Sequence, residues 1–131
     1  FGLTETALGI IPGGGGTQLL PRRIGGARAK ELIFSARRIN AKEAEAIGLV
    51  FKVVPTDRLD KEVETTIRAI AANAPISLRE AKRAIDLGLE RDLRNGLKIE
   101  REAYNITLAT EDRNEGLRAF AEKRKPNFQG R

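Results

Sequence analysis

A run of four glycines, Gly13 to Gly16, follows Pro12 near the start of the chain and constrains its fold more than any other feature. Each glycine loses more conformational entropy on ordering than any other residue, so four together are costly. We therefore expect backbone to approach another group closely here. The loop could present free amides to an anion at the start of a helix, or it could be a tight turn with close helix packing.

The common nucleotide-binding loops do not fit this run. The residues Gly-Gly-Gly-Gly-Thr-Gln lack the Lys-Ser/Thr pair of a Walker loop, and no Gly-x-Gly-x-x-Gly occurs in the chain. Both nucleotide motifs are therefore excluded.

The composition narrows the chemistry. The chain has 131 residues, enough for one domain that buries a core without disulfides or metals. It has no cysteine and no histidine, which excludes thiol nucleophiles, Ser-His-Asp triads and the usual zinc sites, and we predict no metal site. Acid–base chemistry must use carboxylates, lysines or the single tyrosine, Tyr104.

The absence of methionine, the lack of long apolar segments and the net charge indicate what kind of protein the chain comes from and which partners it could bind. Because processing rarely removes methionine before phenylalanine, we expect Phe1 not to be a natural start and the chain to be the C-terminal part of a longer protein. No segment approaches the roughly 18 apolar residues of a membrane span, and no signal peptide opens the chain, so we expect neither secretion nor membrane embedding. The charge of +6 favours polyanionic partners, nucleic acid or multiply phosphorylated ligands, or reflects a solvated surface.

Helical periodicity dominates the sequence after the glycines. Asn40 with Glu43, and Ser77 with Glu80, have capping-box spacing. We expect helices over 27–37, from Asn40 to Gly48, from about Thr56 to Ile70, from Ser77 to Leu89, from Leu93 to Leu108 and after Thr110. We expect burial of the apolar residues that share helix faces: Leu59, Val63, Ile67 and Ile70; Leu78, Ala81, Ile85 and Leu89; Leu117, Phe120 and Ala121.

Strands are expected to be few. Leu49 to Val54 is β-branched and aromatic and is stopped by Pro55, which predicts a strand, and a second short edge strand could run from Thr6 to Ile11. Because an isolated strand cannot satisfy its own backbone groups, these strands indicate a sheet upstream of the chain.

Glu5 lies eight residues before the first glycine of the run, next to an apolar stretch. It could be an ordinary surface carboxylate. A carboxyl group that is partly desolvated by apolar neighbours is, however, suited to proton transfer near neutral pH.

The segment GLTETALGIIPGGGGTQLLPRRIG resembles the enoyl-CoA hydratase, or crotonase, superfamily. It matches the pattern Gly-x-x-Glu-x-x-x-Gly-x-x-Pro-Gly-x-Gly-Gly-Thr-Gln-x-Leu-x-Arg from Gly2 through Arg22. The resemblance continues through ELIFSARRINAKEAEAIGLVFKVVP and ATEDRNEGLRAFAEKRKPNF, and it looks especially like the methylglutaconyl-CoA hydratase branch.

The resemblance implies an α/β crotonase-like fold, a spiral of ββα turns followed by a C-terminal helical region that helps to form trimers or dimers of trimers. We expect residues 1–54 to be the end of the spiral core and residues 55–131 to be the helical region, so that this chain is predominantly α-helical with one or two short strands.

By the same resemblance, Glu5 matches the second catalytic glutamate, an acid toward the α-carbon, and Gly13 matches a glycine whose amide helps to hold the attacking water. Tyr104, Phe120 and Lys123 match positions that contact CoA, the last two at its adenine and phosphate end and commonly from a neighbouring subunit. Phe120 could instead be core and Lys123 ordinary surface.

The implied function is hydration of trans-2-enoyl-CoA to 3-hydroxyacyl-CoA in fatty-acid or branched-chain amino-acid breakdown, without a cofactor because CoA is part of the substrate. The family's oxyanion hole and first catalytic glutamate precede Phe1, so we expect the chain alone to be inactive. Double-bond isomerisation, RNA binding and a purely structural oligomerisation module are the alternatives. The expected compartment is the cytoplasm for a bacterial protein and the mitochondrial matrix for a eukaryotic one.

Overall fold

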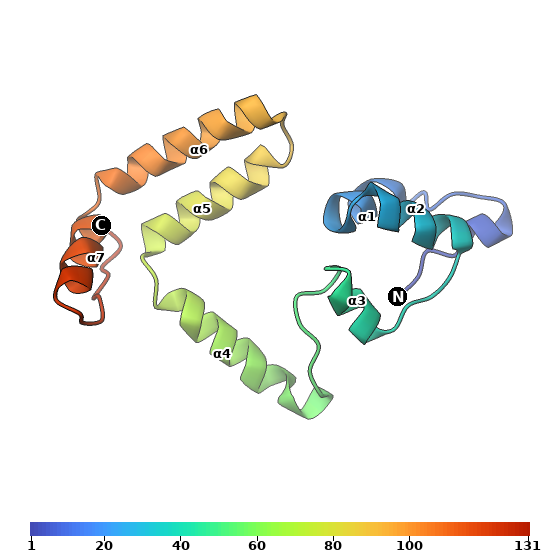
Figure 1. Cartoon of the computed structure of the whole chain (residues 1–131), viewed down its shortest axis with the longest axis horizontal. Coiled ribbons are helices and arrows are strands. Elements are labelled where there is room, and N and C mark those ends of the chain that lie inside the picture. Colours follow the sequence, from blue (N-terminus) through green and yellow to red (C-terminus); the bar gives the residue numbers. More distant parts are fainter. The chain divides into compact units, whose positions relative to one another are not determined.

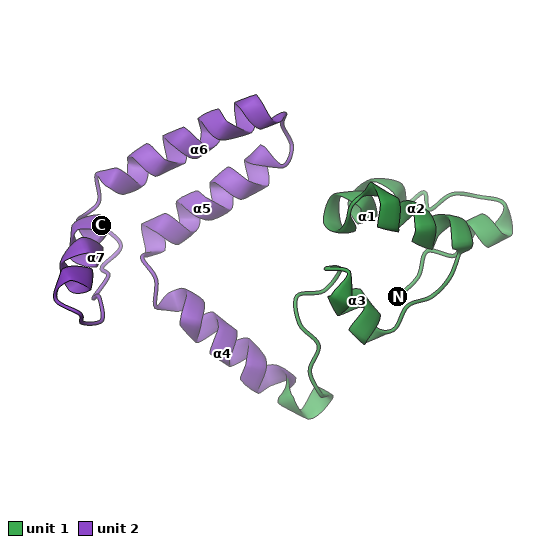
Figure 2. Ribbon diagram, viewed as in Figure 1, with its two compact units in different colours: residues 1–58 green, residues 59–131 purple.

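The computed structural model describes all 131 residues, which divide into two compact units, residues 1–58 and residues 59–131 (Figure 2). Unit 1 contains η1 (Glu5–Leu8), α1 (Gly16–Ile24), α2 (Gly26–Ser35), α3 (Ala41–Ala46) and η2 (Thr56–Arg58). Unit 2 contains α4 (Leu59–Ala71), α5 (Pro75–Gly88), α6 (Leu93–Leu108) and α7 (Glu111–Ala121) (Figure 1). None of these helices combines the length and the apolar character that a membrane crossing requires.

Unit 1 is built around a small apolar core between α1, α2 and α3. Its buried members are Ile24, Ala29, Leu32, Ile39 and Ala44, and Leu20, Ile47, Leu49 and Val50 pack against them. Helices α1 and α2 lie against each other, separated in sequence by Gly25 at φ +84°. This backbone angle favours glycine and allows the chain to turn directly from one helix into the next.

The predicted strands are absent from the structure. The segment from Thr6 to Ile11, the site of the optional second strand, contains no strand, and its first three residues belong to the 3₁₀ turn η1. Leu49 to Val54 is also not a strand: the amides of Leu49 and Val50 donate to the carbonyl of Ala44, and the Val53 amide donates to the Glu45 carboxylate. High β propensity does not make a strand where no neighbouring strand accepts the hydrogen bonds.

Phe1 and Ile39 are joined by a reciprocal pair of backbone hydrogen bonds, without forming a strand. The Phe1 amine donates to the Ile39 carbonyl and the Ile39 amide donates to the Phe1 carbonyl, both at 2.9 Å. This exchanged pair joins the first residue of the chain to the segment after α2.

One predicted helix cap is confirmed in part and the other is wrong. The Asn40 side chain accepts a hydrogen bond from the Glu43 amide at 2.9 Å, but the Glu43 carboxylate binds Arg37. Helix α5 begins at Pro75, so Ser77 lies inside the helix and does not cap it. Proline fits the first helical position because its φ is preset and its missing N–H is not needed there.

Unit 2 exposes most of the apolar faces that the sequence predicts to be buried. Leu59, Val63, Ile67 and Ile70 of α4 are 47–58% exposed, and Ile85, Leu89, Leu117 and Phe120 are 56–85% exposed. The predicted burial is therefore wrong for this chain, because within the unit only α5 and α6 pack extensively on each other. The α5–α6 hairpin is close at its turn, where Gly88 and Gly96 face each other.

Candidate active site

Glu5, the predicted catalytic acid, is the first residue of η1 in unit 1. The hydroxyl of the next residue, Thr6, donates to the carbonyl of Ile33 at 2.5 Å and so fixes the turn to α2. The Glu5 carbonyl accepts from the Ile10 amide at 3.2 Å, which closes the turn on its other side. The Glu5 backbone is therefore held from two directions.

The Glu5 side chain is half-buried, and its Oε2 atom is buried with no hydrogen-bond partner in the chain. Buried polar atoms are nearly always paired, so an unpaired carboxylate oxygen calls for an explanation. An oxygen without a partner in the chain is available to exchange a proton with a bound substrate.

The structure shows which glycines of the run the fold requires. Gly15 has φ +97°, a backbone conformation that side chains rarely allow. A Cβ on Gly16 would lie 2.7 Å from Pro12 Cβ and 2.9 Å from Leu3 Cδ1. Gly15 and Gly16 therefore serve a tight turn and close packing, which is the structural reading of the run.

Gly13 and Gly14 are different, because the chain itself does not need glycine there. A Cβ on Gly13 would find only the Ile11 carbonyl, at 3.8 Å, and one on Gly14 would find nothing within 4 Å. The Gly13 amide also donates to no acceptor in the chain. Gly13 is thus free to offer its amide to a bound molecule, although no hydrogen bond joins it to Glu5.

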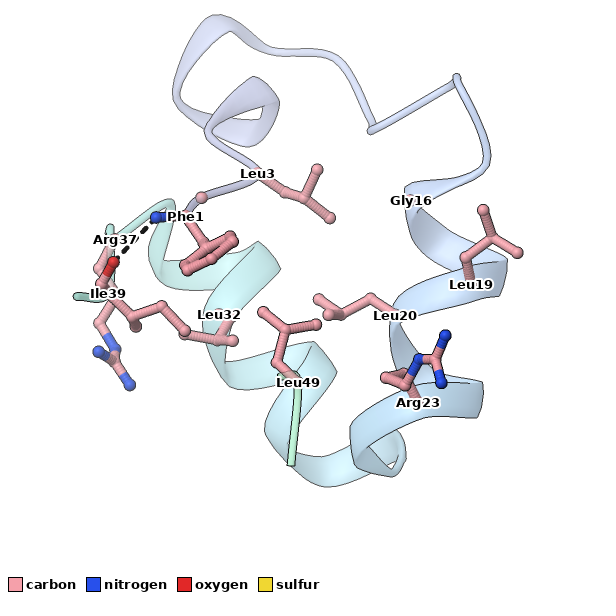
Figure 3. A pocket seen from close by; sticks show the side chains of 11 residues that line it. Phe1, Leu3, Gly16, Leu19, Leu20, Arg23, Leu32, Arg37, Ile39 and Leu49 are labelled. Carbon is pink, nitrogen blue, oxygen red and sulfur yellow. Dashed lines mark hydrogen bonds between the residues drawn. The ribbon is translucent and has the colours of Figure 1, made fainter. Parts of the chain in front are cut away.

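A cavity of about 450 Å³ lies between the start of the chain, α1 and α2. Figure 3 shows the side chains of Phe1, Leu20, Leu32 and Leu49 directed into this space, with the Phe1 amine bonded to Ile39 beside them. The lining residues come from separate segments of unit 1. Sequence reasoning missed this cavity because no local pattern marks residues that only folding brings together.

Arg37 also lines the cavity, but its charge is already neutralised. It donates from Nε to Glu31 at 2.7 Å and from Nη1 to Glu43 at 2.6 Å, and so joins α2 to α3. The bond to Arg37 lowers the pKa of Glu31, and the two carboxylates raise the pKa of Arg37. Arg37 is therefore committed to the fold and is a poor candidate for holding a phosphate.

The residues predicted to contact CoA lie in unit 2, whereas Glu5 and Gly13 lie in unit 1. Tyr104 of α6 is 58% exposed and Phe120 of α7 is 85% exposed. Lys123 follows α7, is exposed and forms no ion pair within the chain. Phe120 is therefore not a core residue of this chain, and both rings and the ammonium are accessible.

Sequence reasoning missed two carboxylates of α7 that organise the chain around Lys123. Asp112 is 2% exposed and accepts from the amides of Gln129 and Gly130 at 2.6 and 2.8 Å. Glu115 binds Arg124 through both oxygens, and this guanidinium lowers the pKa of Glu115 to about 2. The only local signal was the acidic first turn of the helix, which does not reveal partners 9 to 18 residues away.

No group of three or more acidic side chains is arranged to hold a metal ion. The described residues offer one carboxyl with a buried, unpaired oxygen, free backbone amides in a glycine loop, and a separate set of exposed rings and a lysine.

Comparison with known proteins identifies the family of the chain. The model of the enoyl-CoA hydratase/isomerase family matches residues 1–131, so the chain belongs to this family. It is 54% identical to YngF of Bacillus subtilis over 130 residues, which are 99% of this chain and 50% of that protein. It is 50% identical to the mitochondrial methylglutaconyl-CoA hydratase of Rattus norvegicus over 134 residues, covering 99% of this chain and 42% of that protein.

The fold agrees with solved structures of the same family. The crystal structure of enoyl-CoA hydratase from Bacillus anthracis superposes with a TM-score of 0.87 at 53% identity, over 99% of this chain and 50% of that one. The crotonase-like fold expected from the sequence is therefore confirmed, although without the expected strands. The chain spans about half the length of the curated relatives it matches.

Proposed function

We propose that the protein carrying this chain hydrates trans-2-enoyl-CoA thioesters to 3-hydroxyacyl-CoA. One water adds across the double bond: its oxygen bonds to the β-carbon, and a proton is delivered to the α-carbon. The observation that carries this proposal is the buried, unpaired Glu5 Oε2 on a fixed turn. The names of the rat and Bacillus anthracis relatives, both hydratases, support it.

In this proposal Glu5 is the acid that protonates the α-carbon, and the free Gly13 amide helps to hold the water. The family resemblance assigns the activation of water to a second glutamate, and polarisation of the thioester carbonyl to backbone amides; both precede Phe1 in that assignment. Donors to a developing oxyanion are commonly worth about a hundred- to a thousand-fold in rate. We therefore propose that residues 1–131 alone are inactive.

Tyr104, Phe120 and Lys123 contact the CoA part of the substrate, and no separate cofactor is needed. An aromatic ring can stack on adenine and a lysine can pair with phosphate, and in this structure all three side chains are uncovered. The exposed apolar residues of α4 and α7 support assembly into a trimer or a dimer of trimers, in which a neighbouring subunit would supply this end of the site.

The competing activities rest on weaker grounds. Double-bond isomerisation in an acyl-CoA would also use a positioned acid, and the matching family model includes isomerases in its description. RNA binding rests on net charge, but Arg37, Arg68, Arg83 and Arg124 are held in ion pairs with carboxylates. A bacterial source would place the enzyme in the cytoplasm and a eukaryotic source in the mitochondrial matrix, in fatty-acid or branched-chain amino-acid breakdown.

The test is hydration of crotonyl-CoA, followed by loss of the absorbance of the conjugated thioester, with the full-length protein beside residues 1–131. We expect turnover in the full-length protein and none in the shorter chain. Formation of 3-hydroxybutyryl-CoA, checked by mass, distinguishes hydration from isomerisation. A full-length protein that binds CoA but does not hydrate crotonyl-CoA or longer enoyl-CoA would overturn the proposal.

A further inference from the structure

We propose that Glu115 is the positioning residue for Lys123, because it fixes the turn that presents this ammonium to the phosphates of CoA. The inference rests on the proposed function and extends it to a residue that contacts no ligand. It starts from the backbone at the end of α7.

Helix α7 ends in a turn that normally requires glycine. The Lys123 amide donates to the Phe120 carbonyl at 3.2 Å and the Arg124 amide donates to the Ala119 carbonyl at 3.0 Å, the two bonds of a Schellman motif. Lys123 occupies the left-handed position of this motif, at φ +54°. Glycine is usual at this position because a side chain strains the backbone there.

A strained side chain persists only where its surroundings hold it, and such strain is concentrated at functional sites. Two non-glycine residues in the chain have a positive φ, Ala36 and Lys123, and Lys123 is the one with a charged group. The presence of lysine at this position therefore indicates a function that requires its ammonium group and that glycine could not perform.

Glu115 supplies the hold. Its Oε1 accepts from Arg124 Nη1 at 2.6 Å and from the Asn127 amide at 2.9 Å. Its Oε2 accepts from Arg124 Nη2 and from Arg118 Nη2, each at 3.0 Å. The residue directly after Lys123 is thus fixed by a two-pronged ion pair, and the chain three residues further on is fixed by the same carboxylate.

The Glu115 side chain is 13% exposed and that of Arg124 is 38% exposed, so the ion pair between them is partly shielded from water. Asp112 holds the rest of the tail through the amides of Gln129 and Gly130. The chain around Lys123 is therefore held to α7 on both sides: by α7 itself before Lys123, and by hydrogen bonds of the following segment to Glu115 and Asp112.

Glu115 also selects which cation is free. Arg118 and Arg124 lie on either side of Lys123 in the sequence, and both are held in ion pairs: Arg118 with Glu115, and Arg124 with Glu115 and Glu122. Lys123 has no carboxylate partner, so it keeps its charge available for a phosphate. Glu115 thus fixes the turn and engages both neighbouring arginines, and Lys123 is left without a carboxylate partner.

The first test compares two substrates, crotonyl-CoA and crotonyl-pantetheine, which lacks the nucleotide end of CoA. For Glu115→Gln in the full-length protein, we expect KM for crotonyl-CoA to rise about threefold to tenfold, in the range of energies that couple neighbouring residues, with kcat nearly unchanged. KM for crotonyl-pantetheine should not change. A merely structural role would affect both substrates alike, and that result would overturn the inference.

The second test asks whether Glu115 acts through Lys123. Lys123→Gly should raise KM for crotonyl-CoA and also raise the melting temperature, because it removes the charge and relieves the backbone. Adding Glu115→Gln to Lys123→Gly should produce no further rise in KM. Additive effects of the two changes would contradict positioning through this lysine.

Matched controls are available close by. Glu111 is an exposed carboxylate of the same helix, paired with Arg131, and Lys125 is the next lysine along the chain. Glu111→Gln and Lys125→Ala should leave KM for crotonyl-CoA as in the wild type. An equal effect of Lys125→Ala would mean that general positive charge, and not the positioned Lys123, holds the ligand, which would overturn the inference.

Calorimetric titration with CoA itself separates this inference from the proposed reaction. A protein that binds CoA without hydrating crotonyl-CoA loses the proposed function, and a weaker Kd in Glu115→Gln would still support the positioning role. Absence of CoA binding in the wild type would overturn both.

Discussion

Unit 1 buries Ile24, Leu32 and Ile39 in a continuous apolar core, whereas the buried side chains of unit 2 are alanines and three polar residues, Glu80, Thr110 and Asp112. Steric constraints determine the path of the backbone in unit 1: the chain turns at Gly25, which has a positive φ, and there is no space for a Cβ at Gly16. Unit 2 is held by one helix hairpin and by carboxylates that accept several hydrogen bonds each.

This difference matches the tasks that we propose for the two units. Proton transfer needs an acid held within a fraction of an ångström, and in unit 1 the turn that carries Glu5 is tied to α2 by the hydrogen bond from Thr6 to Ile33. Recognition of a charged nucleotide needs accessible rings and cations, which a polar, open scaffold can display. The exposed apolar faces of α4 and α7 leave room for a further partner to complete unit 2.

The largest expected effect would come from removing the acid of unit 1. Glu5→Gln in the full-length protein should lower turnover of crotonyl-CoA by at least about a hundred-fold, the lower range for loss of an acid–base group, with little change in CoA affinity. Asp57→Asn, at an exposed carboxylate of the same unit, is the control and should be near wild type. Near-normal turnover in Glu5→Gln would end the assignment of Glu5 as the acid.

The steric character of unit 1 is tested at the glycine run. Gly16→Ala should lower the free energy of unfolding by about 1–3 kcal/mol, because the new methyl would overlap Pro12 and Leu3. Gly14→Ala should change it by less than about 0.5 kcal/mol, because nothing lies within 4 Å. Denaturant unfolding measures both, and equal effects would show that the packing at Gly16 is not tight.

In unit 2 we expect binding to suffer more than chemistry. Lys123→Ala should raise KM for crotonyl-CoA about tenfold, as for loss of one charged hydrogen bond, and should lower kcat much less. Initial rates over a range of substrate concentrations give both constants. A variant in which kcat falls as much as kcat/KM would place Lys123 in the chemical step and erase the contrast between the units.

The ion pair between Glu115 and Arg124 in unit 2 predicts how the stability of the protein changes in acid. Arg124 lowers the pKa of Glu115 from 4.5 to about 2, so this carboxylate stabilises the fold above pH 4.5 and loses that contribution as the pH falls toward 2. Melting temperatures between pH 5 and pH 2 should therefore fall less steeply in Glu115→Gln than in the wild type. A parallel decline in the two proteins would show that the ion pair adds no stability.

A small, stabilising effect is expected at Gly96, inside α6. A Cβ there would lie 3.6 Å from the Gly88 carbonyl oxygen, an ordinary contact, so Gly96→Ala should stabilise the protein by about 0.5–1 kcal/mol through helix propensity. The same substitution is thus expected to have opposite signs in the two units. A destabilised Gly96→Ala would mean that the hairpin is packed as tightly as the glycine run.

Most helices could be predicted because their signals are local, but α1, with Pro21 in its interior, is not among those expected from the sequence. The apolar residues from Leu93 to Leu108 lie on α6, Asn40 caps α3, and α7 follows Thr110, as the sequence predicts. Ser77 fails as a cap for an equally local reason, since Pro75 already starts the helix. Glu5 and Gly13 could be proposed because a family pattern covers them, and their roles stay predictions.

Other features could not be predicted because they depend on partners distant in the sequence. Leu49 to Val54 has the composition of a strand, but its amides found acceptors on Ala44 and Glu45 instead of on a neighbouring strand. Phe120 has the spacing of a core residue, but no element of this chain covers it.

The sequence by itself determined most of the helices, the family and the position of the candidate acid, because periodicity, caps and motif spacing act over a few residues. The tertiary structure alone decided which glycines must be glycine, which apolar faces are covered, and that Glu115 holds the turn at Lys123. These outcomes depend on atoms that meet only after the chain has folded, such as Leu3 with Gly16 and Glu115 with Arg124.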